Sequence, residues 1–208
     1  MMGTRPLQPI DLRAAAAVVA ASHVDDPAMA WVFPNSRRRE QPLFRLFGLA
    51  LGDVLRAGRV DVAHEDGEIV GVAAWLPPGG FPVPWRRQLA SAPAFGRLAV
   101  ATPTTVPRLL RFLAASTAAF PAEPCWLLDV VGIHPSWQGR GVGTALLAAR
   151  MGDVAEHLHL ETWRERNLAF YARFGFEVAG TDTPLGSVGP RRWTLRHPST
   201  RLGALGSS

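Results

Sequence analysis

The sequence contains no lysine, so every one of its 22 lysine-or-arginine positions is an arginine. A phosphate-binding P-loop requires a lysine that reaches the phosphates, and a pyridoxal-phosphate enzyme requires a lysine that forms a Schiff base. Both classes of protein are therefore excluded.

Cysteine is nearly absent as well, because Cys125 is the single one and an intramolecular disulfide is impossible. Cys125 stands between Pro124 and Trp126 at the start of an apolar stretch. A free cysteine in such a setting usually behaves as a small buried hydrophobe, so we expect core packing and not nucleophilic chemistry.

Long apolar runs are missing too: no run reaches the roughly 20 residues that a membrane-spanning helix requires. The first residues, MMGTRPLQPIDLR, lack the charged-then-apolar pattern of a secretion signal. We therefore expect a cytoplasmic protein with no membrane partner.

The net charge of +5 and the pI of about 11.0 would suit a nucleic-acid-binding protein. However, the arginines are scattered in short clusters and form no basic stripe with interleaved aromatic residues. We expect no nucleic-acid partner; a polyanionic small molecule also suits this charge. The sequence says little about assembly, for which we expect a monomer or a homodimer.

The composition, 48% hydrophobic and 19% charged, is that of a globular chain, and 208 residues suffice for one core. We expect one domain over residues 1–198 and a disordered tail over residues 199–208. Hydrophobic periodicity and turn signals predict an α/β fold in which helices flank a mixed sheet. The expected helices are 11–22 (with Asp11 as N-cap), 41–57, 86–99, 104–119, 142–157 and 167–174, and the expected strands are 59–64, 68–76, 126–133, 158–162, 176–180 and 191–196.

The most informative segment lies between the strand 126–133 and the helix that begins near Val142. It carries alternating glycines at Gly139, Gly141 and Gly143. Glycine lets the backbone approach a ligand closely, and the first N–H groups of a helix have no intrahelical partner. Such a loop can bind phosphate without a charged side chain. The spacing G-x-G-x-G departs from the dinucleotide fingerprint G-x-G-x-x-G, and taken alone it also fits a plain glycine turn.

In context, the stretch V-x-I-x-P-x-x-Q-x-x-G-x-G at residues 131–143 resembles the signature of the GNAT acetyltransferase superfamily. The combination Leu160-Glu161-Thr162, Asn167, Phe170-Tyr171 and Gly175-Phe176 is similar to the second half of that signature. From Glu123 to about Pro198 the chain is most similar to the puromycin N-acetyltransferase-like enzymes of that superfamily.

This resemblance implies the GNAT acyltransferase fold, with a mostly antiparallel central sheet that splays between its fourth and fifth strands. It also implies acetyl-CoA as cofactor, with the pantetheine arm in the gap beside the strand 126–133 and the pyrophosphate on the glycine loop. The implied cofactor-binding residues are Val131, Ile133, Gln138, Gly139, Arg140, Gly141, Val142, Gly143, Thr144, Asn167 and Tyr171.

Acetyl transfer from a thioester to an amine needs a neutral amine, a stabilised oxyanion and a proton for the leaving thiolate. By the resemblance, Tyr171 is the general acid; by spacing alone it would be a core aromatic. Glu161 is the first candidate for the base, although pairing with an arginine is the alternative. Asp129 is the second candidate, because a carboxylate in an apolar strand is costly unless it is paired or useful. We expect the oxyanion to meet a backbone N–H near Val131.

The acceptor is expected to be a small-molecule amine, for example an antibiotic, that binds in a partly aromatic pocket. The candidate substrate-binding residues are Trp31, Phe33, Phe81, Trp85, Asp129, Glu161 and Trp163. In the GNAT family the loop containing His23, Asp25 and Asp26 borders this pocket. We expect no metal site, because His157 and His159 lack a suitably spaced third ligand. The alternatives are a protein N-terminal or lysine acetyltransferase and a non-catalytic acetyl-CoA-binding module.

Overall fold

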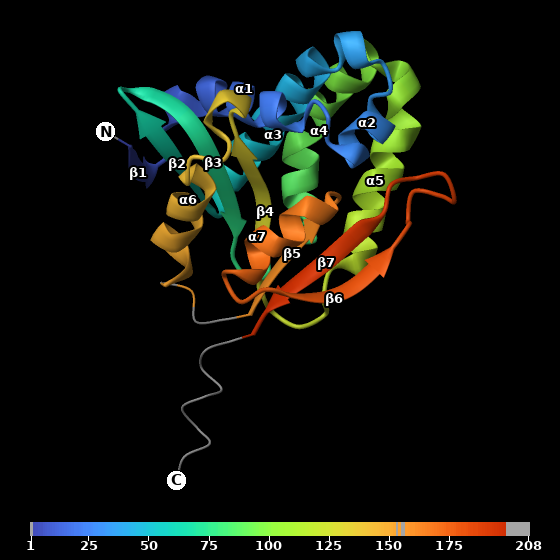
Figure 1. The fold of residues 1–208 in the computed structure, drawn as a ribbon. Coiled ribbons are helices and arrows are strands. Elements are labelled where there is room, and N and C mark those ends of the chain that lie inside the picture. Colours follow the sequence, from blue (N-terminus) through green and yellow to red (C-terminus); the bar gives the residue numbers. More distant parts are fainter. Residues whose placement is uncertain (1, 153, 155–156, 199–208) are drawn as a thin grey trace.

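A computed structural model of the protein describes residues 2–152, 154 and 157–198. Its centre is a seven-stranded sheet with the order β1-β2-β3-β4-β5-β7-β6 (Figure 1). The strands are β1 (Gly3–Pro6), β2 (Arg59–Glu65), β3 (Glu68–Leu76), β4 (Trp126–Ile133), β5 (Leu158–Thr162), β6 (Glu177–Asp182) and β7 (Arg192–His197). The neighbouring pairs are antiparallel except β4 and β5, which are parallel.

The parallel pair is also where the sheet opens. Strands β4 and β5 are paired only at Trp126 with Leu158 and Leu127 with His159. β3 accompanies β4 on its other edge as far as Ile133. Among the described residues, the edge of β4 that faces β5 therefore has no strand partner beyond Leu127, and the two strands diverge toward their C-terminal ends as the resemblance predicted.

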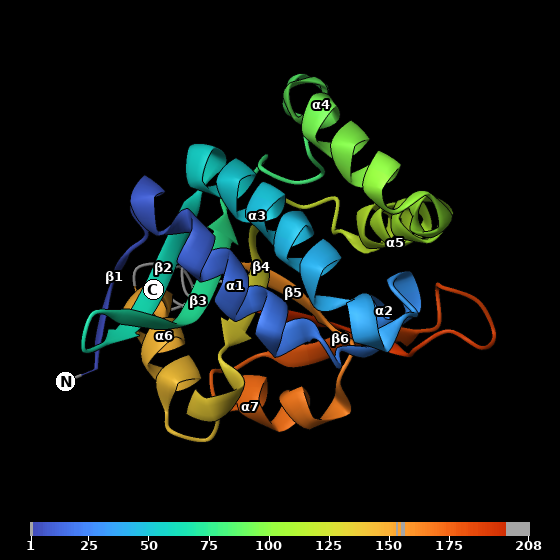
Figure 2. The same ribbon diagram turned by 90° about the horizontal axis from the view of Figure 1, so that it is seen from above.

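Helices cover both faces of the sheet (Figure 2). Helices α1 (Leu12–His23) and α3 (Glu40–Ala57) pack on one face, with α2 (Pro27–Val32), α4 (Trp85–Ala101) and α5 (Val106–Ala119) beside them, and α6 (Val142–Met151) and α7 (Leu168–Ala172) lie on the other. The two apolar clusters between sheet and helices bury large side chains, which is the main favourable contribution to folding.

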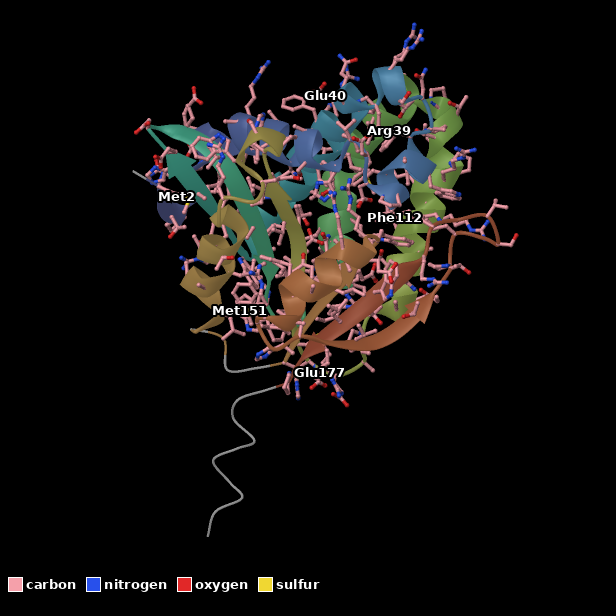
Figure 3. All side chains as sticks on the ribbon, viewed as in Figure 1. Met2, Arg39, Glu40, Phe112, Met151 and Glu177 are labelled. Atoms are coloured by element: carbon pink, nitrogen blue, oxygen red, sulfur yellow. The ribbon has the colours of Figure 1, made fainter. Side chains whose placement is uncertain are left out.

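The segment between α1 and α3 is held by a buried arginine. Arg39 lies at the start of α3 (Figure 3) and is only 7% exposed. Its guanidinium donates hydrogen bonds to the carbonyl oxygens of Val24, Phe33 and Pro34. Asp26 caps α2 by accepting from the backbone N–H groups of Ala28 and Met29. These bonds fix the chain that leaves the end of α1.

Several expectations need correction. Strand β1 was not predicted, because four residues with Pro6 among them carry no alternating pattern; it pairs with β2. Asp11 makes no capping bond to α1, since its carboxylate accepts from Arg5 at 2.6 Å. The helix predicted over residues 142–157 ends at Met151. The tail expected over residues 199–208 lies outside the described residues.

Candidate active site

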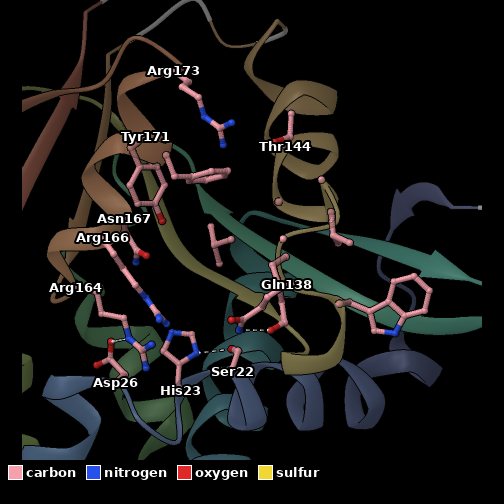
Figure 4. Close-up of a pocket in the computed structure, with 18 residues that line it drawn as sticks. Ser22, His23, Asp26, Gln138, Thr144, Arg164, Arg166, Asn167, Tyr171 and Arg173 are labelled. Atoms are coloured by element: carbon pink, nitrogen blue, oxygen red, sulfur yellow. Dashed lines mark hydrogen bonds and ion pairs between the residues drawn. The ribbon is translucent and has the colours of Figure 1, made fainter.

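A cavity of about 590 Å³ opens at the gap between β4 and β5 (Figure 4). It lies between the loop that leads into α6 and the segment that leads from β5 into α7. Every residue expected to bind the cofactor lines it except Arg140, whose guanidinium instead lies over the Trp137 ring at 5.0 Å. The lining comprises Ser22, His23, Asp26, Val131, Ile133, Trp137, Gln138, Gly139, Gly141, Val142, Gly143, Thr144, Arg164, Arg166, Asn167, Phe170, Tyr171 and Arg173.

One wall of the cavity is the backbone of the glycine loop. Gly139 and Gly141 have φ of 76° and 81°, which side chains other than glycine rarely adopt, and Gly141 is the N-cap of α6. A Cβ on either glycine would meet no atom within 4 Å, so both face open space. The helical hydrogen bonds begin with the Ala145 N–H, which donates to the Gly141 carbonyl. The N–H groups before Ala145 are thus available to an anion.

The opposite wall is formed by the start of α7. Asn167 and Tyr171 are four residues apart and lie on the same side of this short helix, next to Phe170. The Asn167 amide is held by a hydrogen bond of 3.1 Å to the Thr162 hydroxyl. Burial raises the pKa of the Tyr171 phenol above its ordinary value. Tyr171 therefore stays protonated at neutral pH and is able to donate a proton.

Three arginines beside this wall were not singled out from the sequence. Arg164, Arg166 and Arg173 line the cavity from the segment around Asn167. Arg164 pairs with Asp26 at 3.5 Å across the cavity, from the loop after β5 to the loop after α1. The clustering of arginines within ten residues of Asn167 was the signal in the sequence. These cations give the cavity a charge that suits a phosphorylated ligand.

Asp129 occupies a β-bulge in the strand beside the cavity. Trp75 pairs with Leu128 and Ala74 pairs with Val130, so Asp129 is the additional residue on β4. A bulge re-aims side chains, and Asp129 interacts electrostatically with Asp53 of α3 and Arg87 of α4, on the face of the sheet that α3 covers. The bulge lies two residues before Val131, where we expected the oxyanion to meet a backbone N–H.

The surroundings of Asp129 raise the pKa of its carboxyl group. The side chain is exposed to solvent. Desolvation by the surrounding protein, together with the negative charges of Asp53 and Glu161, raises the pKa of Asp129 to about 6, while Arg87 opposes the shift. Arg87 is itself bonded to the Asp53 carboxylate. A carboxylate with this pKa is mostly ionised at neutral pH and yet basic enough to take a proton.

Glu161 is engaged in a network. It accepts hydrogen bonds from the Ser116 hydroxyl at 3.0 Å and from Arg192 at 3.3 Å. Arg192 is 3% exposed, and it also binds Asp182 and the Ala115 carbonyl. Burial raises the pKa of Glu161, whereas Arg192 and the Ser116 bond oppose the shift. Of the two carboxylates, Asp129 is the one not tied by a hydrogen bond among the described residues.

The expected acceptor-binding aromatics occupy different settings. Phe33 lies in the hydrophobic core at 3% exposure and does not line the cavity described above. Trp85 begins α4 and is 67% exposed, with Arg86 over its ring. The Phe81 ring packs edge-on against Phe120, and Trp163 contacts Phe112 and Arg192. Trp31 carries the guanidinium of Arg108 over its ring.

Other chemistries find little support among the described residues. No group of three or more histidine, cysteine, aspartate or glutamate side chains in the described ranges is placed to hold a metal ion. Burial raises the pKa of the Cys125 thiol to about 11, which makes it a poor nucleophile. The pKa of His159 falls to about 4 through burial and the charge of Arg192.

No helix over residues 2–152, 154 and 157–198 is long and apolar enough to cross a membrane.

Comparison with known proteins agrees with this geometry. Residues 109–178 match the family described as "Acetyltransferase (GNAT) domain", a range that includes β4, α6, β5 and α7. This stretch of the chain is thus similar to a GNAT acetyltransferase domain. The match supports an acyltransferase, and GNAT acetyltransferases generally use acetyl-CoA.

Three relatives illustrate the likeness. A crystal structure from Corynebacterium glutamicum, described as histone acetyltransferase HPA2 and related acetyltransferase, has 27% identity and a TM-score of 0.69, with 95% of this chain and 96% of that chain covered. Arylalkylamine N-acetyltransferase 2 from Aedes aegypti shares the fold at 9% identity and a TM-score of 0.60, covering 95% and 98% of the two chains. Mycothiol acetyltransferase from Propionibacterium freudenreichii is 38% identical over 69 residues, which are 30% of this chain and 22% of the relative. The chain thus spans about a fifth of that curated relative.

Proposed function

We propose that this protein is an acetyl-CoA-dependent N-acetyltransferase that acetylates the primary amine of a small molecule by direct attack in a ternary complex. The observation that carries the proposal is the cavity at the splayed β4–β5 gap. It combines an anion-binding glycine loop with a protonated tyrosine, and a carboxylate of raised pKa lies on the adjoining strand.

The residues of the cavity fit coenzyme A. Gly139–Thr144 offer backbone N–H groups to the pyrophosphate, and Arg164, Arg166 and Arg173 add positive charge. The unpaired edge of β4 near Val131 and Ile133 offers backbone groups to the pantetheine amides, as an added strand would. When bound, the cofactor supplies an acetyl group activated as a thioester.

Side chains of the protein then bind the charged amine and transfer protons. Asp129 attracts the acceptor ammonium and takes a proton from it, so that the nitrogen becomes nucleophilic. Glu161, held by Arg192 and Ser116, adds negative charge to the same side of the sheet. Tyr171 donates its phenolic proton to the departing sulfur.

The acceptor is proposed to be a cationic small molecule, because the acidic groups Asp53, Asp129 and Glu161 interact with one another on the acceptor side. An antibiotic amine is one such molecule, and this suggestion rests on the sequence prediction that residues 123–198 resemble puromycin N-acetyltransferase-like enzymes. The relatives' names mention mycothiol, histone and arylalkylamine, so they do not narrow the choice. Phe81 and Trp163 are the aromatic residues proposed to contact its apolar part.

The test is a panel of small amines, peptides and proteins with thiol release from acetyl-CoA as the readout. We expect release that depends on a small primary amine. Tyr171→Phe should retain acetyl-CoA affinity within about twofold and lower kcat at least about tenfold, because only the proton donor is lost. Acetyl-CoA binding with no turnover on any acceptor would indicate a binding module, and turnover on peptides alone would indicate a protein acetyltransferase.

A further inference from the structure

His23 lies where the acceptor side meets the cofactor cavity. It is the last residue of α1, and α1 packs against β4 in the apolar cluster that contains Leu127 and Val130. This packing is close, because a Cβ on Gly132 would lie 2.7 Å from the Ser22 hydroxyl and 3.0 Å from the Val19 Cα. Yet His23 lines the cavity together with Tyr171 and Asn167 (Figure 4). The imidazole therefore borders the proposed cofactor cavity at the end of α1.

The hydrogen bonds of His23 fix its tautomer. Nδ1 lies 2.9 Å from the Val19 carbonyl oxygen and 2.8 Å from the Ser22 hydroxyl. A carbonyl oxygen only accepts, so Nδ1 must carry the hydrogen. In the neutral ring, Nε2 then keeps a lone pair, and no hydrogen bond within residues 2–152, 154 and 157–198 engages it. Figure 4 shows Nδ1 joined to Ser22 while the opposite edge of the ring faces the cavity.

The surroundings keep this imidazole neutral. Desolvation is the largest influence and lowers the pKa of His23, and the charge of Arg164 lowers it further. Asp26 and the bond to the Val19 carbonyl act in the opposite direction without reversing the shift. The Phe47 ring packs at 4.8 Å, and Arg166 is a further cation of the cavity. His23 is thus a fixed, neutral proton acceptor at neutral pH.

The proton balance of acetyl transfer calls for such a group. A protonated primary amine carries three hydrogens on nitrogen, and the amide product carries one. As the carbon–nitrogen bond forms and the carbon–sulfur bond breaks, two protons leave nitrogen and one is delivered to sulfur. In the proposed mechanism, Asp129 accepts the first proton from nitrogen, and Tyr171 delivers a proton to sulfur. The second proton from nitrogen needs its own acceptor, which must also be able to reprotonate Tyr171.

We propose that Nε2 of His23 accepts the second proton from the attacking nitrogen and returns it to Tyr171 across the cavity. This inference rests on the proposed acetyltransferase function. The net release of one proton to solvent then comes from Asp129. Ser22 and the Val19 carbonyl act as the orienting partners that keep Nε2 directed at the reaction, as a fixed hydrogen bond does for a catalytic histidine.

The activity test uses His23→Asn, because the asparagine amide can still donate near the Nδ1 position but has nothing at Nε2. We expect kcat to fall about 100-fold, the typical contribution of a general base, with the acetyl-CoA dissociation constant unchanged within about twofold. His64→Asn, in β2 and away from the cavity, is the matched control and should keep full activity. Free imidazole should partly restore His23→Ala but not Tyr171→Phe.

A second readout needs no turnover. Two-dimensional 15N NMR of the ligand-free protein should show His23 as the Nδ1–H tautomer at pH 7, which is the less common one in free histidine. An Nε2–H tautomer or a protonated ring at pH 7 would overturn the proposal, as would full kcat in His23→Asn. Failure of the wild-type protein to acetylate any amine would instead overturn the acetyltransferase function, so the two failures are distinguishable.

Discussion

Replacing Asp129 by asparagine should change the shape of the pH profile as well as the rate. The base is active when ionised, and desolvation with neighbouring negative charge raises the pKa of Asp129 to about 6. The raised pKa moves the acidic loss of activity upward from the range of an ordinary aspartate. The wild-type kcat/KM should therefore fall as pH drops through 6 and should be flat above pH 7.

The expected change in kcat/KM follows from the pKa of Asp129. A group with a pKa of about 6 is about 90% ionised at pH 7 and about 10% ionised at pH 5, so its titration alone lowers kcat/KM about tenfold. An alkylamine acceptor with a pKa of roughly 10 stays protonated throughout, so its own titration does not contribute below pH 8. Loss of the base should cost at least about 100-fold at pH 7.

The assay is kcat/KM for the best amine between pH 5 and 10, followed by thiol release. In Asp129→Asn the plateau should disappear, and the rate should keep rising tenfold per pH unit toward the pKa of the amine. Asp53→Asn is the companion variant: removing this negative charge lowers the pKa of Asp129 and shifts the acidic limb to lower pH. A wild-type rate that rises without a plateau to pH 10 would refute Asp129 as the base.

Two further changes test the cofactor wall and the supporting network. Gly143→Val should raise the acetyl-CoA dissociation constant at least about tenfold, because even a Cβ at this position would lie 3.2 Å from Phe170. Isothermal titration calorimetry should show no such change for Gly152→Val, because a Cβ at Gly152 would meet no atom within 4 Å. Arg192→Met should lower the free energy of unfolding by roughly 3 kcal/mol in urea denaturation, because it leaves the mostly buried Glu161 without its cation. An unchanged urea midpoint would show that the ion pair adds nothing to stability.

Much of the fold could be predicted because its signals are local. The hairpin of β2 and β3 follows from alternation around Asp66-Gly67, and β4 from an apolar run of strand length. Strand β1 could not be predicted in this way, because it owes its existence to pairing with β2 and not to its own pattern. The short pairing of β4 with β5 was expected only through the family resemblance.

The candidate site was predictable on the cofactor side and less so on the acceptor side. The glycine loop is contiguous in sequence, so the sequence shows all of it, and the family resemblance indicated a phosphate site there. The acceptor side is assembled from distant segments: Asp129 is influenced by Asp53, more than 70 positions earlier, and Glu161 is tied to Arg192. For His23 the sequence indicated only a loop that borders the acceptor pocket, since its proposed role depends on the close contact of α1 with Gly132.

Positive and negative side chains lie on different sides of β4. Arg164, Arg166 and Arg173 lie on the cavity side, whereas Asp53 and Asp129 influence each other on the face covered by α3. Under the proposed function, a polyanionic cofactor and a cationic acceptor are therefore drawn to opposite sides of one strand. They would meet at the gap, where Tyr171 and His23 line the cavity and the bulge at Asp129 lies on the adjoining strand. This arrangement favours the proposed ternary complex over sequential binding at one site.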